Sequence, residues 1–292
     1  MSEQNNQIEL SKPTIAELPV TVQALCDWQQ DGDIVQLHPG DLGWYGRMGT
    51  EDTIEAIRTW KRNDQTVAIG LLDGRDLLRI AIDPTVTEDP ALADRMAEDS
   101  TNPENGVLPE GAATVEARSG SLLKDRLIAH GWEKGEPWTS LKRDLSEPVE
   151  DSGLRIEVVT SDQTQDRVAV QQASFDNSTF TEEKWHAMAA GLPYKEARCL
   201  VGYDEDNPVA IATVWSAGVG KPGLIEPLGV DNNHRRKGYG RAITLAAAGA
   251  LREMGSSSAT VCTDSVNVGA VATYKSAGFE ELPDIEDLTR RR

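Results

Sequence analysis

The sequence predicts an α/β fold arranged as two tandem domains. Its 292 residues are long for one ordinary domain and suit two domains of roughly 140 residues each. Strand-like and helix-like segments alternate along the chain, and the two halves repeat a similar order of elements. The polar, acidic stretch SEPVEDSG at 146–153 contains proline and glycine and is the best linker candidate. We therefore expect domains at 1–148 and 153–292.

Apolar spacing and chain breakers define the elements expected in the first half. Ile54, Ile57 and Trp60 recur at helical spacing, so residues 51–62 are expected to form one helix. The segment 38–44 reads as a turn with a packing tryptophan and points to no function. Further helices are expected at 90–98 and 121–130, and strands at 34–37, 66–72, 77–82, 112–117 and 138–145.

The second half repeats this alternation after the linker. Its longest expected helix, 240–254, is strongly amphipathic and is ended by Gly255. The pair Gly131-Trp132 near the end of the first half echoes Gly278-Phe279 near the end of the second, which indicates an internal duplication. Other helices are expected at 163–175, 181–190 and 268–276, and strands at 154–159, 197–204, 208–216, 223–230, 259–263 and from 278 onward.

Composition and charge narrow the classes of function. The formal net charge of −19 argues against nucleic acid as a partner and suits a cationic amine, although solubility alone explains an acidic surface. No apolar run approaches the roughly 20 residues that cross a membrane, and the polar N-terminus lacks a signal-peptide core. The three cysteines and four histidines are scattered, so we expect a cytoplasmic protein without a metal site.

The most informative segment is LIEPLGVDNNHRRKGYGR at 224–241. An apolar strand leads into a loop with three basic residues at 235–237, and Gly238 and Gly240 then open a long helix. The first N–H groups of a helix have no intrahelical partner and carry partial positive charge, which favours phosphate. The glycines leave room for a phosphate to approach the backbone. The alternative is a basic turn that only starts a helix.

A second segment, NVGAVATYKSAGF at 267–279, places three residues on one helical face. Asn267, Ala270 and Tyr274 recur at intervals of three and four residues. A phenol in that position can protonate a leaving thiolate. The alternative is that Tyr274 is a core residue with a hydrated hydroxyl group.

Together the two segments resemble the GNAT superfamily of N-acetyltransferases, over roughly residues 153 to 285. That family carries [RQ]-x-x-G-x-[GA] after its fourth strand, matched here by 235–240, and later Asn, Ala, Tyr and Gly-Phe, matched by 267–279. The resemblance implies two GNAT-like domains, each with a mixed, mostly antiparallel sheet flanked by helices. The first domain looks degenerate, because TVTEDPAL follows its corresponding strand and offers acids where phosphate would bind. The tandem arrangement also looks like mycothiol synthase-like two-domain acetyltransferases.

The resemblance implies a direct attack of a small-molecule primary amine on acetyl-CoA, with Tyr274 as general acid. Glu226, two residues before Leu228 on the same strand, is expected to act as base or water relay, or only to bind a cationic acceptor. An acyl-CoA-binding sensor or pseudoenzyme is the alternative function, and a monomer or a homodimer is expected. The implied acyl-CoA contacts are Leu228, Gly229, Val230, Arg235, Arg236, Lys237, Gly238, Tyr239, Gly240, Arg241 and Asn267.

Overall fold

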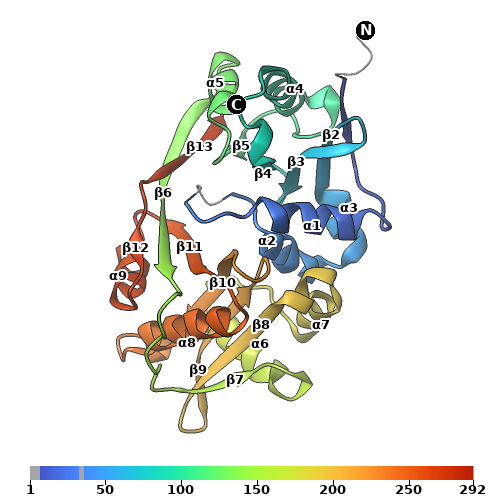
Figure 1. Cartoon of the computed structure of the whole chain (residues 1–292). Helices are drawn as coiled ribbons and strands as arrows, with labels where there is room; N and C mark the ends of the chain where they lie inside the picture. Colours follow the sequence, from blue (N-terminus) through green and yellow to red (C-terminus); the bar gives the residue numbers. More distant parts are fainter. Residues whose placement is uncertain (1–6, 33–35, 292) are drawn as a thin grey trace. The chain divides into compact units, whose positions relative to one another are not determined.

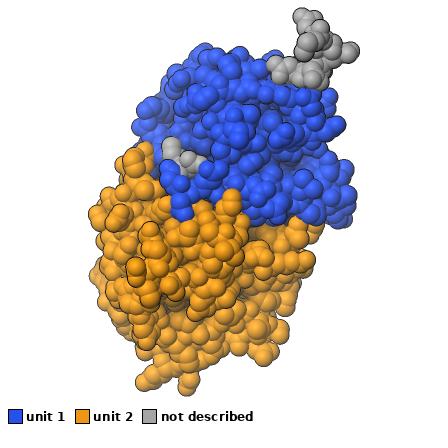
Figure 2. All heavy atoms as spheres, viewed as in Figure 1, with its two compact units in different colours: residues 1–38, 51–138, 285–292 blue, residues 39–50, 139–284 orange. Residues whose placement is uncertain are grey.

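The computed structural model describes residues 7–32 and 36–291, which form two compact units (Figure 2). Unit 1 comprises Met1–His38, Glu51–Trp138 and Ile285–Arg292, and unit 2 comprises Pro39–Thr50 and Thr139–Asp284. Most of the strand expected at 34–37 lies outside the described residues.

The compact units do not follow the linear division into 1–148 and 153–292. Residues 39–50, from the first half of the sequence, belong to unit 2, and the chain's last strand belongs to unit 1. The linker candidate 146–153 lies within unit 2, where Glu150 pairs with Arg143 at 2.6 Å and with Arg241 at 3.2 Å. Each unit is therefore completed by a segment distant in sequence.

Unit 1 is built on a mostly antiparallel sheet (Figure 1). Its strands run in the order β1 (Ile8–Ser11), β2 (Ile57–Arg62), β3 (Gln65–Leu72), β4 (Leu77–Ile82), β5 (Ala113–Glu116), β13 (Ile285–Arg290) and the first part of β6 (Glu133–Asp144). Only β4 and β5 pair in parallel among the register pairs of this unit. The longer helices are α1 (Leu18–Trp28), α4 (Pro90–Thr101) and α5 (Ser121–Ala129), with short η3 (Pro84–Val86) and η4 (Pro103–Asn105) between them.

The single helix expected at 51–62 is wrong. Helix α3 (Thr50–Ala56) stops after two turns, and the chain continues as strand β2. Ile57 and Trp60 are fully buried, and β2 pairs with both β1 and β3. Ile, Thr and Trp favour a half-buried pleated surface, so pairing on both edges outweighs the helical spacing.

Unit 2 has a sheet of the same kind. From the second part of β6, its order is β11 (Ser258–Asp264), β10 (Pro222–Val230), β9 (Asn207–Trp215), β8 (Ala197–Asp204) and β7 (Arg155–Val158), while β12 (Glu280–Glu281) pairs with β6. Strands β10 and β11 are parallel, whereas β7 to β10 are antiparallel neighbours. The expected mixed, mostly antiparallel sheet is therefore confirmed. The helices are α6 (Thr164–Ser174), α7 (Glu182–Ala190), α8 (Tyr239–Glu253) and α9 (Val268–Ser276), with short η5 (Ser161–Gln163), η6 (Leu192–Glu196) and η7 (Asn232–His234).

The segment expected to be a turn forms helix α2 (Pro39–Tyr45) and short η2 (Gly46–Met48) of unit 2. A Cβ atom at Gly40 or Gly43 would lie 2.5 or 2.2 Å from the side chain of Trp215 on β9. Glycine at both positions therefore lets α2 lie directly on the indole ring.

Among the described residues, no helix has the length and apolar character needed to cross a membrane.

Two pairs of turns show that the units repeat one another. After β4, the Asp83 N–H donates to Val67 O at 3.0 Å, and after β10 the Asp231 N–H donates to Val209 O at 3.0 Å. Both aspartates also cap the short helix that follows. Counting back along each strand, residue 82 corresponds to residue 230, and residue 80 to residue 228.

The ends of α5 and α9 match in the same way. Gly131 and Gly278 have φ angles of +86° and +82°. The next amide donates to Leu127 O at 3.1 Å after α5 and to Tyr274 O at 3.2 Å after α9. Leu127 therefore stands in unit 1 where Tyr274 stands in unit 2.

Candidate functional site

A cleft opens in unit 2 where β10 leaves β11. The two strands pair only through Leu224 and the two residues before it, while β10 stays paired with β9 as far as Val230. The register with β9 shifts between Ile225 and Leu228, which is a β-bulge at Glu226-Pro227. The bulge lies where the parallel pairing ends, so one edge of β10 is left unpaired by its own sheet beyond this point.

The hydrogen bonds between β9 and β10 show which residues of β10 direct their backbone groups to the free edge. Asp231 N–H is directed to β9, and residues along an antiparallel strand alternate between the two edges. Gly229 therefore faces β9, and Leu228 and Val230 direct their N–H and C=O groups away from it. A Cβ atom at Gly229 would lie 2.7 Å from Ser174 Cβ, so glycine allows the end of α6 to lie against β10.

Helix α8 begins beside this edge without a side-chain cap. Its N-cap residue is Gly238 with φ +87°, and Arg236 just before it has φ +65°. The first-turn N–H groups and the helix dipole therefore remain available to an anion. Gly240 also has a packing role, because a Cβ atom there would lie 3.0 Å from Thr273 Cγ2. That glycine lets α8 and α9 approach each other closely.

The basic side chains around this helix start differ in their partners. Arg235 is exposed, and its Nη2 donates to Ser174 O at 2.9 Å, which holds it at the end of α6. Arg241 donates through Nε to Ser276 O at 2.8 Å and pairs with Glu150. Tyr239 directs its hydroxyl group to Asp204, and this bond raises the pKa of the phenol.

Tyr274 and Asn267 approach the cleft from α9. The Asn267 side chain accepts from Ala270 N–H at 3.2 Å and so caps the helix. Tyr274 is 7% exposed, and burial, with the carboxylate of Glu226 as a smaller cause, raises the pKa of its phenol well above the usual value of 10. The phenol is therefore protonated at neutral pH and able to donate.

A cavity of about 780 Å³ joins these elements. Three of the predicted site residues do not line this cavity: Glu226, Lys237 and Tyr239. Glu226 is nevertheless close enough to Tyr274 to raise the pKa of the phenol. The sequence motifs did not indicate Ser174 and Asp176 at the end of α6, or the other α9 residues Gly269, Ala272, Thr273 and Ser276, because no pattern there signals a ligand. The lining comprises Ser174, Phe175, Asp176, Leu228, Gly229, Val230, Arg235, Arg236, Gly238, Gly240, Arg241, Asn267, Gly269, Ala270, Ala272, Thr273, Tyr274 and Ser276.

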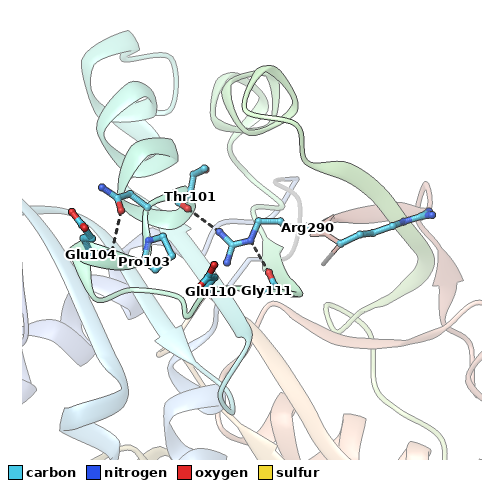
Figure 3. A pocket seen from close by; sticks show the side chains of 8 residues that line it. Thr101, Pro103, Glu104, Glu110, Gly111 and Arg290 are labelled. Atoms are coloured by element: carbon cyan, nitrogen blue, oxygen red, sulfur yellow. Dashed lines mark hydrogen bonds between the residues drawn. The ribbon is translucent and has the colours of Figure 1, made fainter.

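A second cavity, of about 860 Å³, lies in unit 1 around Arg290 of β13 (Figure 3). The guanidinium donates to Thr101 O and to Gly111 O, each at 2.8 Å, and also to Pro109 O. Its plane lies over the Trp132 ring, 5.1 Å from the centroid. These bonds hold the last strand in unit 1, and the guanidinium donates them to backbone carbonyl groups of the protein.

Within residues 7–32 and 36–291, no group of three or more His, Cys, Asp or Glu residues could hold a metal ion.

With this geometry in place, comparison with known proteins identifies a family that matches part of the chain. Residues 161–279 match the family model described as Acetyltransferase (GNAT) family. The match spans α6 to the Gly278-Phe279 turn, and so includes β10, the start of α8 and Tyr274. The similarity to the GNAT acetyltransferase family therefore covers the part of the chain that carries the cleft.

Individual relatives extend the likeness of fold to most of the chain. A tandem GNAT protein from the clavulanic acid biosynthesis pathway is 14% identical, with a TM-score of 0.59, and the alignment covers 97% of this chain and 98% of that one. A GCN5-related N-acetyltransferase from Sphaerobacter thermophilus is 18% identical, with a TM-score of 0.58 and coverage of 97% and 95%. Mycothiol acetyltransferase of Thermobispora bispora is 34% identical over 98 residues, 34% of this chain and 32% of that protein. The chain thus matches about a third of the length of this curated relative.

Proposed function

We propose that this protein is an N-acetyltransferase that moves an acetyl group from acetyl-CoA to a primary amine of a small acceptor. One observation carries the proposal: the free edge of β10, the uncapped start of α8 and the buried phenol of Tyr274 line the same cavity. An unpaired strand edge, an uncapped helix start and a buried phenol within residues that match the GNAT family support acetyl-CoA binding and proton donation here.

The residues present are of the kinds that acetyl-CoA requires. The pantetheine arm carries amide groups that an unpaired strand edge can bind, and Leu228 and Val230 offer such an edge. The pyrophosphate needs an anion site, which the first turn of α8 provides together with Arg235, Arg236 and Arg241. Lys237 adds long-range positive charge, and Asn267 borders the same cavity.

Tyr274 and Glu226 divide the proton transfers. The acceptor nitrogen forms a bond to the acetyl carbon, the carbon–sulfur bond breaks, and Tyr274 donates its proton to the leaving sulfur. Glu226 receives the proton that the amine loses, directly or through water. Protonation of Glu226 removes the negative charge that raises the pKa of Tyr274, so the phenol becomes a stronger acid when the sulfur needs a proton.

We propose that the acceptor is a small cationic amine, because the net charge of −19 attracts cations to the protein. The reaction is proposed to take place in the cytoplasm. The similarity to mycothiol acetyltransferase adds a cysteinyl sugar amine to the acceptors to be screened.

Calorimetric titration with acetyl-CoA is the first test, followed by an amine panel read out as release of free thiol. We expect one acetyl-CoA per chain and turnover with at least one amine. Binding without turnover on any amine would favour the acyl-CoA-binding sensor, and no binding at millimolar acetyl-CoA would exclude both functions.

A further inference from the structure

The strand edge in unit 1 that corresponds to the cleft of unit 2 is already occupied by the chain itself. Strands β4 and β5 pair only through Arg79 and the two residues before it, as β10 and β11 do. Beyond Arg79, Leu37 N–H donates to Ile80 O at 3.4 Å, and Gln36 Oε1 accepts from Ile82 N–H at 3.1 Å. Two backbone groups of the free edge of β4, Ile80 O and Ile82 N–H, are therefore bonded to residues 36–37.

This occupied position has an open counterpart in unit 2. Because Ile80 and Ile82 correspond to Leu228 and Val230, the two strands direct the same backbone groups to the same side. In unit 2 these groups border a cavity of about 780 Å³. In unit 1 the equivalent backbone groups are bonded to Gln36 and Leu37.

The segment 36–37 is held from several directions. Gln36 and Leu37 are 6% and 4% exposed. Ser119 Oγ donates to Gln36 Oε1 at 2.5 Å, and Gln29 Nε2 donates to Leu37 O at 3.1 Å. Gln36 Nε2 donates in turn to Trp28 O at 3.4 Å. The oxygen and the nitrogen of the buried Gln36 carboxamide both form hydrogen bonds. Its removal is costly in free energy, because the groups that bond to it would be left buried without partners.

We propose that residues 36–37 are a permanent internal ligand of unit 1. Their amide groups stand where unit 2 would bind the amide-bearing arm of acetyl-CoA, so unit 1 takes no acyl-CoA and its cleft serves to fix the chain just before it enters unit 2 at Pro39. The start of α4 agrees with this assignment, because Asp89 caps it where a phosphate would otherwise bind. The occupied cleft lies in unit 1, so it does not depend on catalysis in unit 2.

Hydrogen–deuterium exchange on the full-length protein tests the proposal. Gln36→Met keeps most of the side-chain volume and removes the carboxamide. We expect amide exchange at the end of β4, residues 80–83, to rise roughly fivefold to tenfold. The matched control is Gln23→Met, which removes an exposed glutamine bonded to Asp27 at 2.9 Å, and should leave β4 unchanged. An unchanged β4 in Gln36→Met would overturn the proposal.

Addition of acetyl-CoA to the wild-type protein separates the two hypotheses. Protection at 228–241 without protection at 80–83 supports both. Protection at 80–83 would overturn the internal ligand and leave the proposed function standing. If 228–241 stays unprotected while Gln36→Met still loosens β4, acetyl-CoA binding in unit 2 fails and the internal ligand stands.

Discussion

Two strand-to-helix connections, one in each unit, end their strands alike and begin their helices differently. After β4, helix α4 starts with Pro90, and the Asp89 carboxylate accepts from Ala91 N–H at 2.9 Å and from Leu92 N–H at 3.2 Å. After β10, helix α8 starts with Tyr239, and its N-cap residue Gly238 provides no side-chain cap. The first helix start neutralises its own dipole, whereas the second leaves its dipole for a ligand.

The same contrast recurs at the other parts of the cleft. The β9–β10 register contains a bulge, whereas the β3–β4 register is continuous. Tyr274 of α9 is replaced by Leu127 of α5, which is fully buried. A repeated backbone can therefore keep its turns and lose its chemistry through a cap, a bulge and one side chain. We expect the ligand-binding and proton-donating roles to reside in unit 2.

The largest expected effect follows from Tyr274→Phe. Removal of the phenolic proton should lower kcat by roughly a hundredfold or more, since a positioned general acid contributes about 10²–10⁴-fold. Acetyl-CoA affinity, measured by calorimetry, should stay within about twofold. Leu127→Met is the matched change at the corresponding residue of unit 1 and should leave kcat unaltered. Full turnover in Tyr274→Phe would remove the general-acid role.

The free energy of unfolding should depend on pH through a group of buried charged residues in unit 1. Asp287 of β13 lies 3.6 Å from Arg118, which in turn pairs with Glu116 at 3.4 Å. Burial raises the pKa of Asp287 from 3.8 to about 6, despite the opposing effect of Arg118. The native state therefore keeps this proton at pH values where the unfolded state has lost it, and stability falls as pH rises from about 4 to about 6.

Asp287→Asn should remove that fall. Relative to wild type, its free energy of unfolding should increase by up to about 3 kcal/mol between pH 4 and pH 7, because one pKa unit is worth about 1.4 kcal/mol. Urea unfolding followed by tryptophan fluorescence at several pH values measures the difference. A difference between the two proteins that does not vary with pH contradicts the assignment.

The Gly238→Asp substitution should make the start of α8 resemble the start of α4, where an aspartate stands at the N-cap. Aspartate would place a carboxylate at the N-terminus of the helix and strain a residue with φ +87°. We expect the Kd for acetyl-CoA to rise roughly tenfold to thirtyfold. Gly106→Asp in unit 1 is the control, because Gly106 also has a positive φ, +71°, and an added Cβ meets nothing within 4 Å at either site. Equal losses of affinity in both variants would mean that strain alone is responsible.

The smallest expected effect on activity comes from the β-bulge at Glu226-Pro227. Trp215 Nε1 donates to Glu226 O at 2.7 Å, which fixes the bulged strand from β9. Trp215→Phe should lower kcat about fivefold with little change in the Kd for acetyl-CoA, since it removes one buried hydrogen bond. Trp60→Phe removes a comparable indole bond in unit 1, to Asp99 at 2.9 Å, and should not slow the reaction. A similar loss in both variants would indicate general destabilisation.

The sequence by itself determined several of the elements and the motif positions of this protein. Strands 197–204 and 77–82 and helix 268–276 agree with the structure residue for residue, because periodicity and capping are local properties of the chain. The basic loop and Tyr274 were also visible in the sequence, since glycine, arginine and a phenol at fixed spacing form a local pattern.

Only the tertiary structure decided which segment completes which cleft. Residues 36–37 fill the free edge of β4, residues 39–50 belong to unit 2, and β13 pairs with β5 across more than 160 residues of sequence. The contact of Gly240 with Thr273 and the end of α3 at Ala56 were likewise hidden. Such features depend on which backbone groups are still unpaired when distant segments meet, and a local sequence pattern does not record that.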